Sequence, residues 1–259
     1  MYRFLLIILV FLIGISSYMA YGVRDQTQLG PTQLRASPQA IVGRIGSVPV
    51  RIPYEYAHLV EYDKDPNFMV TARRAPSSRT YESSIRSFYF DAHFPDMSGQ
   101  SKYGFHRSPK DDIFTSTWIS IAIAAGENYG GNDKLDNAVS NLIKLNRYKF
   151  EEAPGLVYGL VSYRPVGLNA VRRPVAGYSD AQDYNIYIHK GGSGDVDVYV
   201  KCSNVAHAAA SCSMNFLVPR PMQARVTVQF RVGLLKSWAA IHDSTLKLIQ
   251  SFAFYAPIP

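Results

Sequence analysis

The sequence predicts an α+β fold, a mostly antiparallel sheet with covering helices and one disulfide. Short segments that alternate apolar and polar residues, as half-buried strands do, recur from about residue 45 onward. A run of such segments ends in a helical pattern twice, and this order is typical of α+β domains. The repetition allows two similar halves, 45–150 and 151–259.

The first half contains three predicted strands and one predicted helix. The strands are SVPVRI (47–52), SFYFDAHF (87–94) and TWISIAIA (117–124). The last of them is apolar enough to be central in the sheet. The helix is NDKLDNAVSNLIKLNRY (132–148), where Asn132 or Asp133 can cap the first turn. Its apolar residues recur at i, i+4, i+7 and i+8: Leu135, Val139, Leu142 and Ile143.

The second half contains five predicted strands and a closing helix. The strands are LVYGLVSY (156–163), YNIYIH (184–189), DVDVYV (195–200), CSMNFLV (212–218) and ARVTVQFRV (224–232). The glycine-rich segment KGGSGD (190–195) predicts a hairpin turn between the second and third of them. The helix spans 234–252 and has one apolar stripe that can cover a sheet face. The stripe consists of Leu234, Trp238, Ile241, Thr245, Leu248 and Phe252.

The sequence of the N-terminal segment predicts that the protein is exported from the cytosol. The uncharged segment 4–23 is long enough to cross a bilayer as one helix, and only Arg3 precedes it. Residues 1–23 therefore indicate either a signal anchor, which would hold the protein at the inner membrane, or a cleaved signal peptide. The polar segment 24–44 is a predicted linker, and 45–259 is the predicted periplasmic domain.

The two cysteines, Cys202 and Cys212, favour a structural disulfide. In an oxidising compartment, two cysteines on neighbouring extended segments tend to pair. A zinc site would need four ligands, and His207 is the one nearby histidine that could join the two thiolates. A C-x-x-C redox motif is absent from the sequence. Metal binding and free thiols remain the less favoured alternatives.

Two segments of the sequence partly match known functional motifs. The segment GGSGD (191–195) fits neither the G-x-S-x-G turn of serine hydrolases nor a phosphate-binding loop, because a predicted strand follows it. The segment DKDPNF (63–68) starts like a calcium loop but lacks its glycine and its final glutamate. The six histidines form no metal motif, although histidines distant in sequence can meet in space. We expect no cofactor, no metal ion and no enzymatic activity.

The net charge favours an acidic partner. The chain is formally +7, and the part after residue 22 has 26 basic and 20 acidic residues, a net charge of +6. Basic residues gather in two turn-rich segments, 71–86 and 164–178, where they can steer association. Nucleic acid is not an expected partner of an exported protein without a recognition module.

Several segments after residue 45 resemble a known family. They are VPVRIPYEYAHLVEYDKDP, RTYESSIRSFYFDAHFPDMSG, TWISIAIAAGENY, DYNIYIHKGGSGDVDVYVKCSN and VTVQFRVGLLKSWAAIHDS. These segments resemble the periplasmic immunity proteins that are encoded beside phospholipase effectors of bacterial type VI secretion systems. The resemblance implies a protein that binds a toxic lipase in the periplasm and blocks its active site or its access to the membrane.

Candidate partner-binding residues lie in two predicted loops. Aromatic and arginine side chains supply most of the affinity at many interfaces. The candidates are Tyr103, Phe105, His106, Arg107, Arg172 and Arg173. Packing of Tyr103 and Phe105 against the domain's own core is an equal alternative. An envelope protein that binds glycan or anionic lipid, or less favourably a hydrolase, is the alternative function.

Overall fold

The computed structural model describes residues 40–65, 78–100, 116–131, 134–144, 149–166, 184–204 and 210–254. The predicted signal or anchor, residues 1–23, lies outside these ranges. Within them, no helix is both long enough and apolar enough to cross a membrane. The first strand begins at Ala40, within the segment 24–44, and the predicted domain boundaries stay a prediction.

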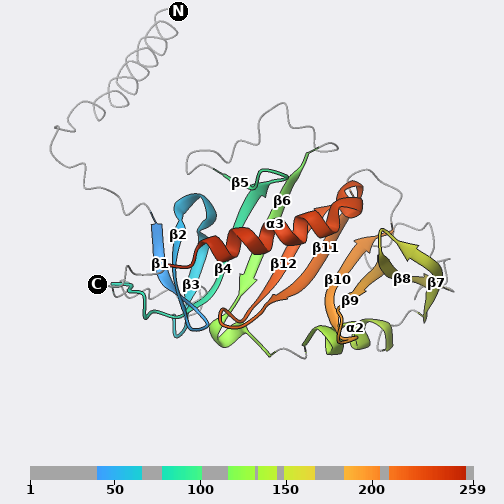
Figure 1. Ribbon diagram of the computed structural model, residues 1–259, viewed down its shortest axis with the longest axis horizontal. Coiled ribbons are helices and arrows are strands. Elements are labelled where there is room, and N and C mark those ends of the chain that lie inside the picture. Colours follow the sequence, from blue (N-terminus) through green and yellow to red (C-terminus); the bar gives the residue numbers. More distant parts are fainter. Residues whose placement is uncertain are drawn as a thin grey trace, which may run out of the picture. The chain divides into compact units, whose positions relative to one another are not determined.

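An antiparallel sheet of ten strands dominates the described part of the chain (Figure 1). The order across the sheet is β3-β4-β6-β12-β11-β10-β9-β8-β7, and β5 pairs with the C-terminal end of β4. The strands are β3 (His58–Tyr62), β4 (Ile85–His93), β5 (Ser98–Gly99), β6 (Trp118–Ala124), β7 (Lys149–Val157), β8 (Leu160–Val166), β9 (Tyr184–Lys190), β10 (Val196–Ser203), β11 (Ser211–Val218) and β12 (Ala224–Arg231). This sheet confirms the predicted fold class.

The strands from β7 to β12 follow one another across the sheet in chain order, and β12 then pairs with β6. One sheet therefore includes strands of both proposed halves, 45–150 and 151–259, and residue 150 lies within β7. A separate hairpin consists of β1 (Ala40–Ile45) and β2 (Val48–Pro53). A similarity between the halves stays a prediction.

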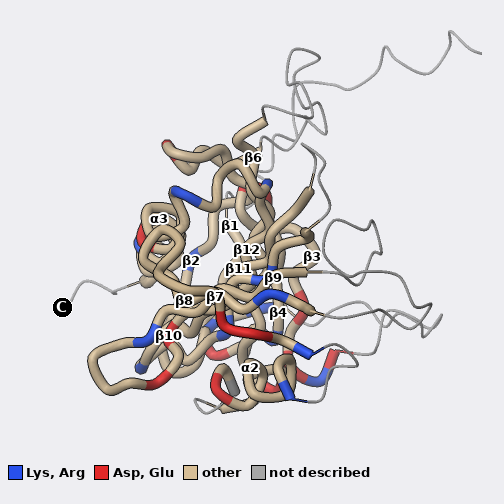
Figure 2. Tube along the Cα trace, turned by 90° about the vertical axis from the view of Figure 1, so that its right-hand side faces the viewer, with Lys and Arg blue, Asp and Glu red and all other residues tan. Residues whose placement is uncertain are grey.

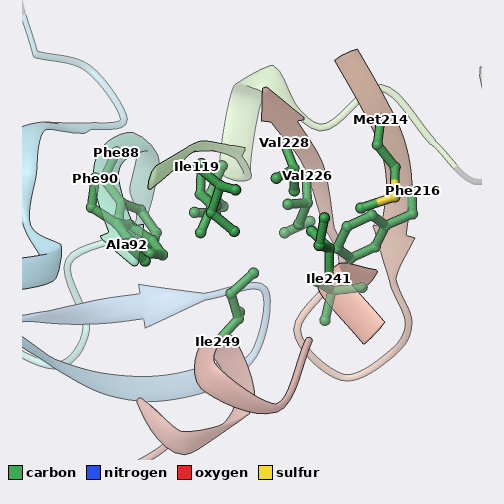
Figure 3. Close-up of a cluster of buried hydrophobic side chains, with 14 of the residues drawn as sticks. Phe88, Phe90, Ala92, Ile119, Met214, Phe216, Val226, Val228, Ile241 and Ile249 are labelled. Carbon is green, nitrogen blue, oxygen red and sulfur yellow. The ribbon is translucent and has the colours of Figure 1, made fainter. Parts of the chain in front are cut away.

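The main core lies between one face of the sheet and α3 (Trp238–Ser251), which crosses the strands (Figure 1). Figure 3 shows apolar side chains from four neighbouring strands near Ile241 and Ile249 of α3. They are Phe88, Phe90 and Ala92 from β4, Ile119 from β6, Val226 and Val228 from β12, and Met214 and Phe216 from β11. In β12, these side chains alternate with the polar residues Arg225, Thr227 and Gln229, as the sequence pattern predicted.

The end of α3 is hydrogen-bonded to β2. The amide of Arg51 donates to the carbonyl of Phe252 at 2.8 Å, and the amide of Phe254 donates to the carbonyl of Pro49 at 2.8 Å. The predicted helix 234–252 begins too early, because residues 232–237 form the 3₁₀ helix η3. Ile249, which was not part of the predicted stripe, is fully buried, whereas Leu248 of the predicted stripe is only half-buried.

A second, smaller core lies under α2 (Lys134–Lys144), which confirms the predicted amphipathic helix. Leu135 and Val139 pack with Ile186 and Ile188 of β9. In the strand register, Ile186 is opposite Lys201 of β10, and Ile188 is opposite Tyr199. The next residues along β10, Val198 and Val200, belong to the main core. Because side chains alternate along a strand, α2 covers the sheet face opposite α3.

One predicted strand is wrong. The segment 156–163 contains the turn between β7 and β8, with Tyr158 and Gly159 as its two central residues. The predicted turn in GGSGD is confirmed, since the amide of Gly194 donates to the carbonyl of Gly191 at 2.9 Å between β9 and β10. The other predicted strands each overlap an observed one, whereas β1, β3, β5 and most of β7 were not predicted.

Candidate functional site

The partner-binding residues predicted from the sequence lie outside the described ranges. Tyr103, Phe105, His106 and Arg107 belong to the segment that connects β5 to β6, and Arg172 and Arg173 to the one that connects β8 to β9. Their role stays a prediction. A candidate site must therefore come from described residues whose exposure, geometry or charge is unusual.

The predicted disulfide is confirmed. Cys202 of β10 and Cys212 of β11 are directly opposite each other in the strand register, and their sulfur atoms are 2.01 Å apart. Both side chains are buried in the main core. The disulfide therefore fixes the register of two central strands, and its sulfurs are not available as ligands.

Among the described residues, three histidines hydrogen-bond to a carboxylate. The distances from Nδ1 to the carboxylate oxygen are 3.0 Å for His93 and Asp96, 2.8 Å for His189 and Asp197, and 2.9 Å for His242 and Asp243. In the described part of the chain, no three or more His, Cys, Asp or Glu side chains are grouped to hold a metal ion.

One of these pairs continues into a chain that resembles a catalytic triad. His93 Nε2 lies 2.9 Å from Thr117 Oγ1, on the side of the ring opposite Asp96. The order hydroxyl, imidazole, carboxylate is that of a nucleophile, a base and an orienting acid. The hydrogen bond to His93 is the main cause that lowers the pKa of the Asp96 carboxyl.

The surroundings of Thr117, His93 and Asp96 favour a structural role. The side chains of His93 and Asp96 are 39% and 62% exposed, and electrostatic catalysis depends on a site that excludes water. The same residues close the end of the β4–β6 pair, where the amide of Phe94 donates to the carbonyl of Thr117 at 3.1 Å. The indole of Trp118 packs edge-on against the His93 ring, with centroids 5.4 Å apart.

The most unusual surface in the described part of the chain is the end of the β7–β8 hairpin. We call residues 156–159 the tip. Leu156 is 67% exposed and Tyr158 is 57% exposed, and a third exposed large apolar residue, Leu59, lies on β3 at the opposite edge of the sheet. A single exposed leucine is common, but Leu156 and Tyr158 bring two exposed large side chains to one turn, and grouped exposed apolar residues are typical of a contact surface.

The local sequence explains the turn. Tyr158 and Gly159 have φ angles of 54° and 82°, as the two central residues of a type I′ turn require. Glycine adopts this conformation without strain, whereas tyrosine does so at a cost. Upstream, Pro154 and Gly155 lie where the register shifts between Glu152 and Leu156. This irregularity interrupts the edge strand β7 and so protects it from pairing with another chain.

A hydrogen bond from Trp238, at the start of α3, holds the backbone of the tip. The indole Nε1 of Trp238 donates to the carbonyl of Tyr158 at 2.9 Å. Trp238 is buried, and its ring contacts His189 at a centroid distance of 5.3 Å. Leu160, the first residue of β8, is fully buried in the main core. The backbone of the tip is therefore held in place while the side chains of Leu156 and Tyr158 face solvent.

The base of the hairpin is polar. Lys149 Nζ lies 2.7 Å from Glu151 Oε1, and the hydroxyl of Tyr163 donates to Glu152 Oε2 at 2.9 Å. Burial is the main cause that raises the pKa of Tyr163, and the Glu152 carboxylate adds to the effect. With Arg164, the segment 149–166 has two basic and two acidic residues, so its net charge is zero. Figure 2 shows the two signs close together along β7.

No protein-family model and no curated protein sequence matches this chain. Among solved structures, the fold is similar to that of Smlt3025, an immunity protein of the Stenotrophomonas maltophilia type IV secretion system. The TM-score is 0.53 at 16% sequence identity, and the alignment covers 89% of this chain and 100% of the other. At this identity the likeness shows a shared fold.

Proposed function

We propose that this protein is an immunity protein, which binds a secreted bacterial toxin and blocks it. The observation that carries the proposal is the likeness of the fold to Smlt3025 over the full length of that protein. The exposed apolar tip supports a role in protein binding. The mechanism is steric: a rigid surface of this protein covers the active site of the toxin or its route to the substrate.

The proposed location is the periplasm. A buried disulfide forms and persists in oxidising compartments, and the sequence of residues 1–23 predicts export. If residues 4–23 are retained, they anchor the protein in the inner membrane. The toxin would then be intercepted near the membrane that it attacks.

The proposed toxin is a phospholipase of a type VI secretion system. This finer assignment rests on the resemblance of the sequence segments to immunity proteins of such effectors. Smlt3025 belongs to a type IV system, so the likeness of the fold supports the general class and leaves the secretion system and the toxin chemistry to experiment.

Affinity purification tests the proposed function. A tagged version of the full chain, isolated from the periplasm, should co-purify in equal amounts with the envelope-active toxin encoded by the adjacent gene. An unrelated tagged periplasmic protein is the control. If this protein instead co-purifies with no toxin and sediments with purified cell wall or anionic liposomes, the result contradicts the proposal and favours the envelope-binding alternative.

A hydrolase is the second candidate function, and the Thr117–His93–Asp96 chain is the observation that favours it. The proposed immunity function predicts that this chain of residues is not needed. Because binding a toxin needs no proton transfer, His93→Ala is expected to leave protection of toxin-producing cells unchanged, as measured by survival. His242→Ala is the matched control, since His242 also pairs with a neighbouring aspartate.

The hydrolase reading predicts a different result. His93→Ala and Thr117→Val would then abolish protection, and Thr117→Ser would restore it, while folding and toxin binding stay unchanged. That pattern would overturn the binding account, because a residue that only packs at the end of β4 does not depend on a hydroxyl nucleophile.

A further inference from the structure

We propose that the tip of the β7–β8 hairpin is the principal anchor of this protein on its toxin and that it inserts into an apolar recess of the toxin surface. The inference rests on the proposed function and specifies the contact. It assigns the central role to Leu156 and Tyr158, in a part of the chain where the sequence predicted an ordinary strand.

The exposure of these side chains is the first argument. Leu156 and Tyr158 are two of the three large apolar or aromatic residues that stand exposed in the described part of the chain. Exposing them to water has a free-energy cost that burial against a partner removes. Tyrosine in particular is enriched among the few residues that dominate binding energy.

The fixed backbone is the second argument. The hydrogen bond from Trp238 to the carbonyl of Tyr158 holds the turn itself, and the full burial of Leu160 holds its β8 side. Trp238, which donates this hydrogen bond, is the first residue of α3, and α3 covers the main core. Insertion of a rigid turn loses little conformational freedom, and such pre-organisation raises affinity.

The charge at the hairpin identifies the chemistry of the partner. The chain is +7, but the segment 149–166 has no net charge, and its carboxylates are engaged with Lys149 and Tyr163. An anionic lipid surface attracts clusters of lysine and arginine, which the tip does not offer. The complementary surface for the tip is a protein recess with apolar walls.

The conformation of the turn provides a test that leaves folding intact. Asparagine adopts positive φ more readily than tyrosine, and Asn-Gly is a preferred type I′ pair. Tyr158→Asn therefore removes the aromatic contact without breaking the turn or its carbonyl acceptor. Leu156→Thr removes the second apolar side chain and keeps a residue that favours strands.

Leu59→Asn is the matched control. Leu59 is 82% exposed and also has a positive φ, 48°, but it lies on β3, at the other edge of the sheet. With the purified toxin encoded by the adjacent gene as the probe, isothermal titration calorimetry should show an affinity about 30-fold weaker or more for Tyr158→Asn. Leu156→Thr should weaken the affinity by about tenfold, and Leu59→Asn by less than about twofold.

The outcomes separate this inference from the proposed function. If the unmodified protein does not bind the toxin, both fail. If it binds and the two tip variants bind within about twofold of it, the tip inference fails and the proposed function stands. Tip-dependent binding to anionic vesicles, or a tip-dependent dimer of this chain detected by light scattering, would also overturn it.

Discussion

Replacing Phe90 by alanine is expected to lower the free energy of unfolding by about 3–5 kcal/mol. Phe90 is fully buried where β4, the 3₁₀ helix η1 (Tyr54–Tyr56) and the end of α3 meet. Its ring lies 5.4 Å from that of Tyr56 and 6.2 Å from that of Phe252. The deletion leaves a cavity that several elements would have to move together to fill.

Urea unfolding followed by tryptophan fluorescence measures this effect. Leu59→Ala is the control, because truncation of an exposed side chain should change the free energy of unfolding by less than about 0.5 kcal/mol. If Phe90→Ala costs less than about 1 kcal/mol, the contact between β4 and the end of α3 is not part of the stabilising core.

A chain without residues 1–23, produced in the cytosol, is expected to give no protection against the toxin. It would not meet the toxin in the periplasm, and the reducing compartment would keep Cys202 and Cys212 as thiols. Loss of the disulfide should lower the free energy of unfolding by about 2–5 kcal/mol. Cell survival measures the first effect, and alkylation of thiols with mass spectrometry detects the second.

The two causes can be separated with an exported chain that has Cys202→Ala and Cys212→Ala. This variant should be less stable by the same amount but should still bind the toxin, since the disulfide is buried in the main core, to which Leu156 and Tyr158 do not belong. Full protection by the chain without residues 1–23 would contradict both the periplasmic location and the proposed encounter with the toxin.

The sequence predicted the centre of the sheet well. In segment 224–232, the core face and the opposite face differ clearly in polarity, so the alternation of residues is visible, whereas segment 117–124 was recognised by its apolar character along its whole length. The helix at 134–144 was equally clear, because its apolar residues recur at helical spacing. Local patterns are informative where one face is buried and the other is not.

The elements at the edges were harder to predict. In β3, Leu59 is exposed and has a positive φ, so the alternation is broken. In LVYGLVSY, apolar residues continue through the turn and hide it, although a Tyr-Gly pair between two apolar runs is a weak hairpin signal. The irregularity at Pro154 and Gly155 further obscures the period of β7.

The features of the candidate site depend on long-range contacts. The pairing of β4 with β6 brings Thr117 to His93, which is 24 residues away in sequence. Trp238 holds the carbonyl of Tyr158 from 80 residues away. Neither contact has a signature in the local sequence, because each follows from the register and order of the strands.

Titration of the purified full chain into the purified, active toxin tests the central claim most directly. Hydrolysis of phospholipid vesicles by the toxin is the measured quantity. The account predicts that hydrolysis falls to the background rate at about one equivalent of this protein, as expected for tight stoichiometric binding. Undiminished hydrolysis at a large excess of this protein, or lipid turnover by this protein that His93→Ala abolishes, would contradict it.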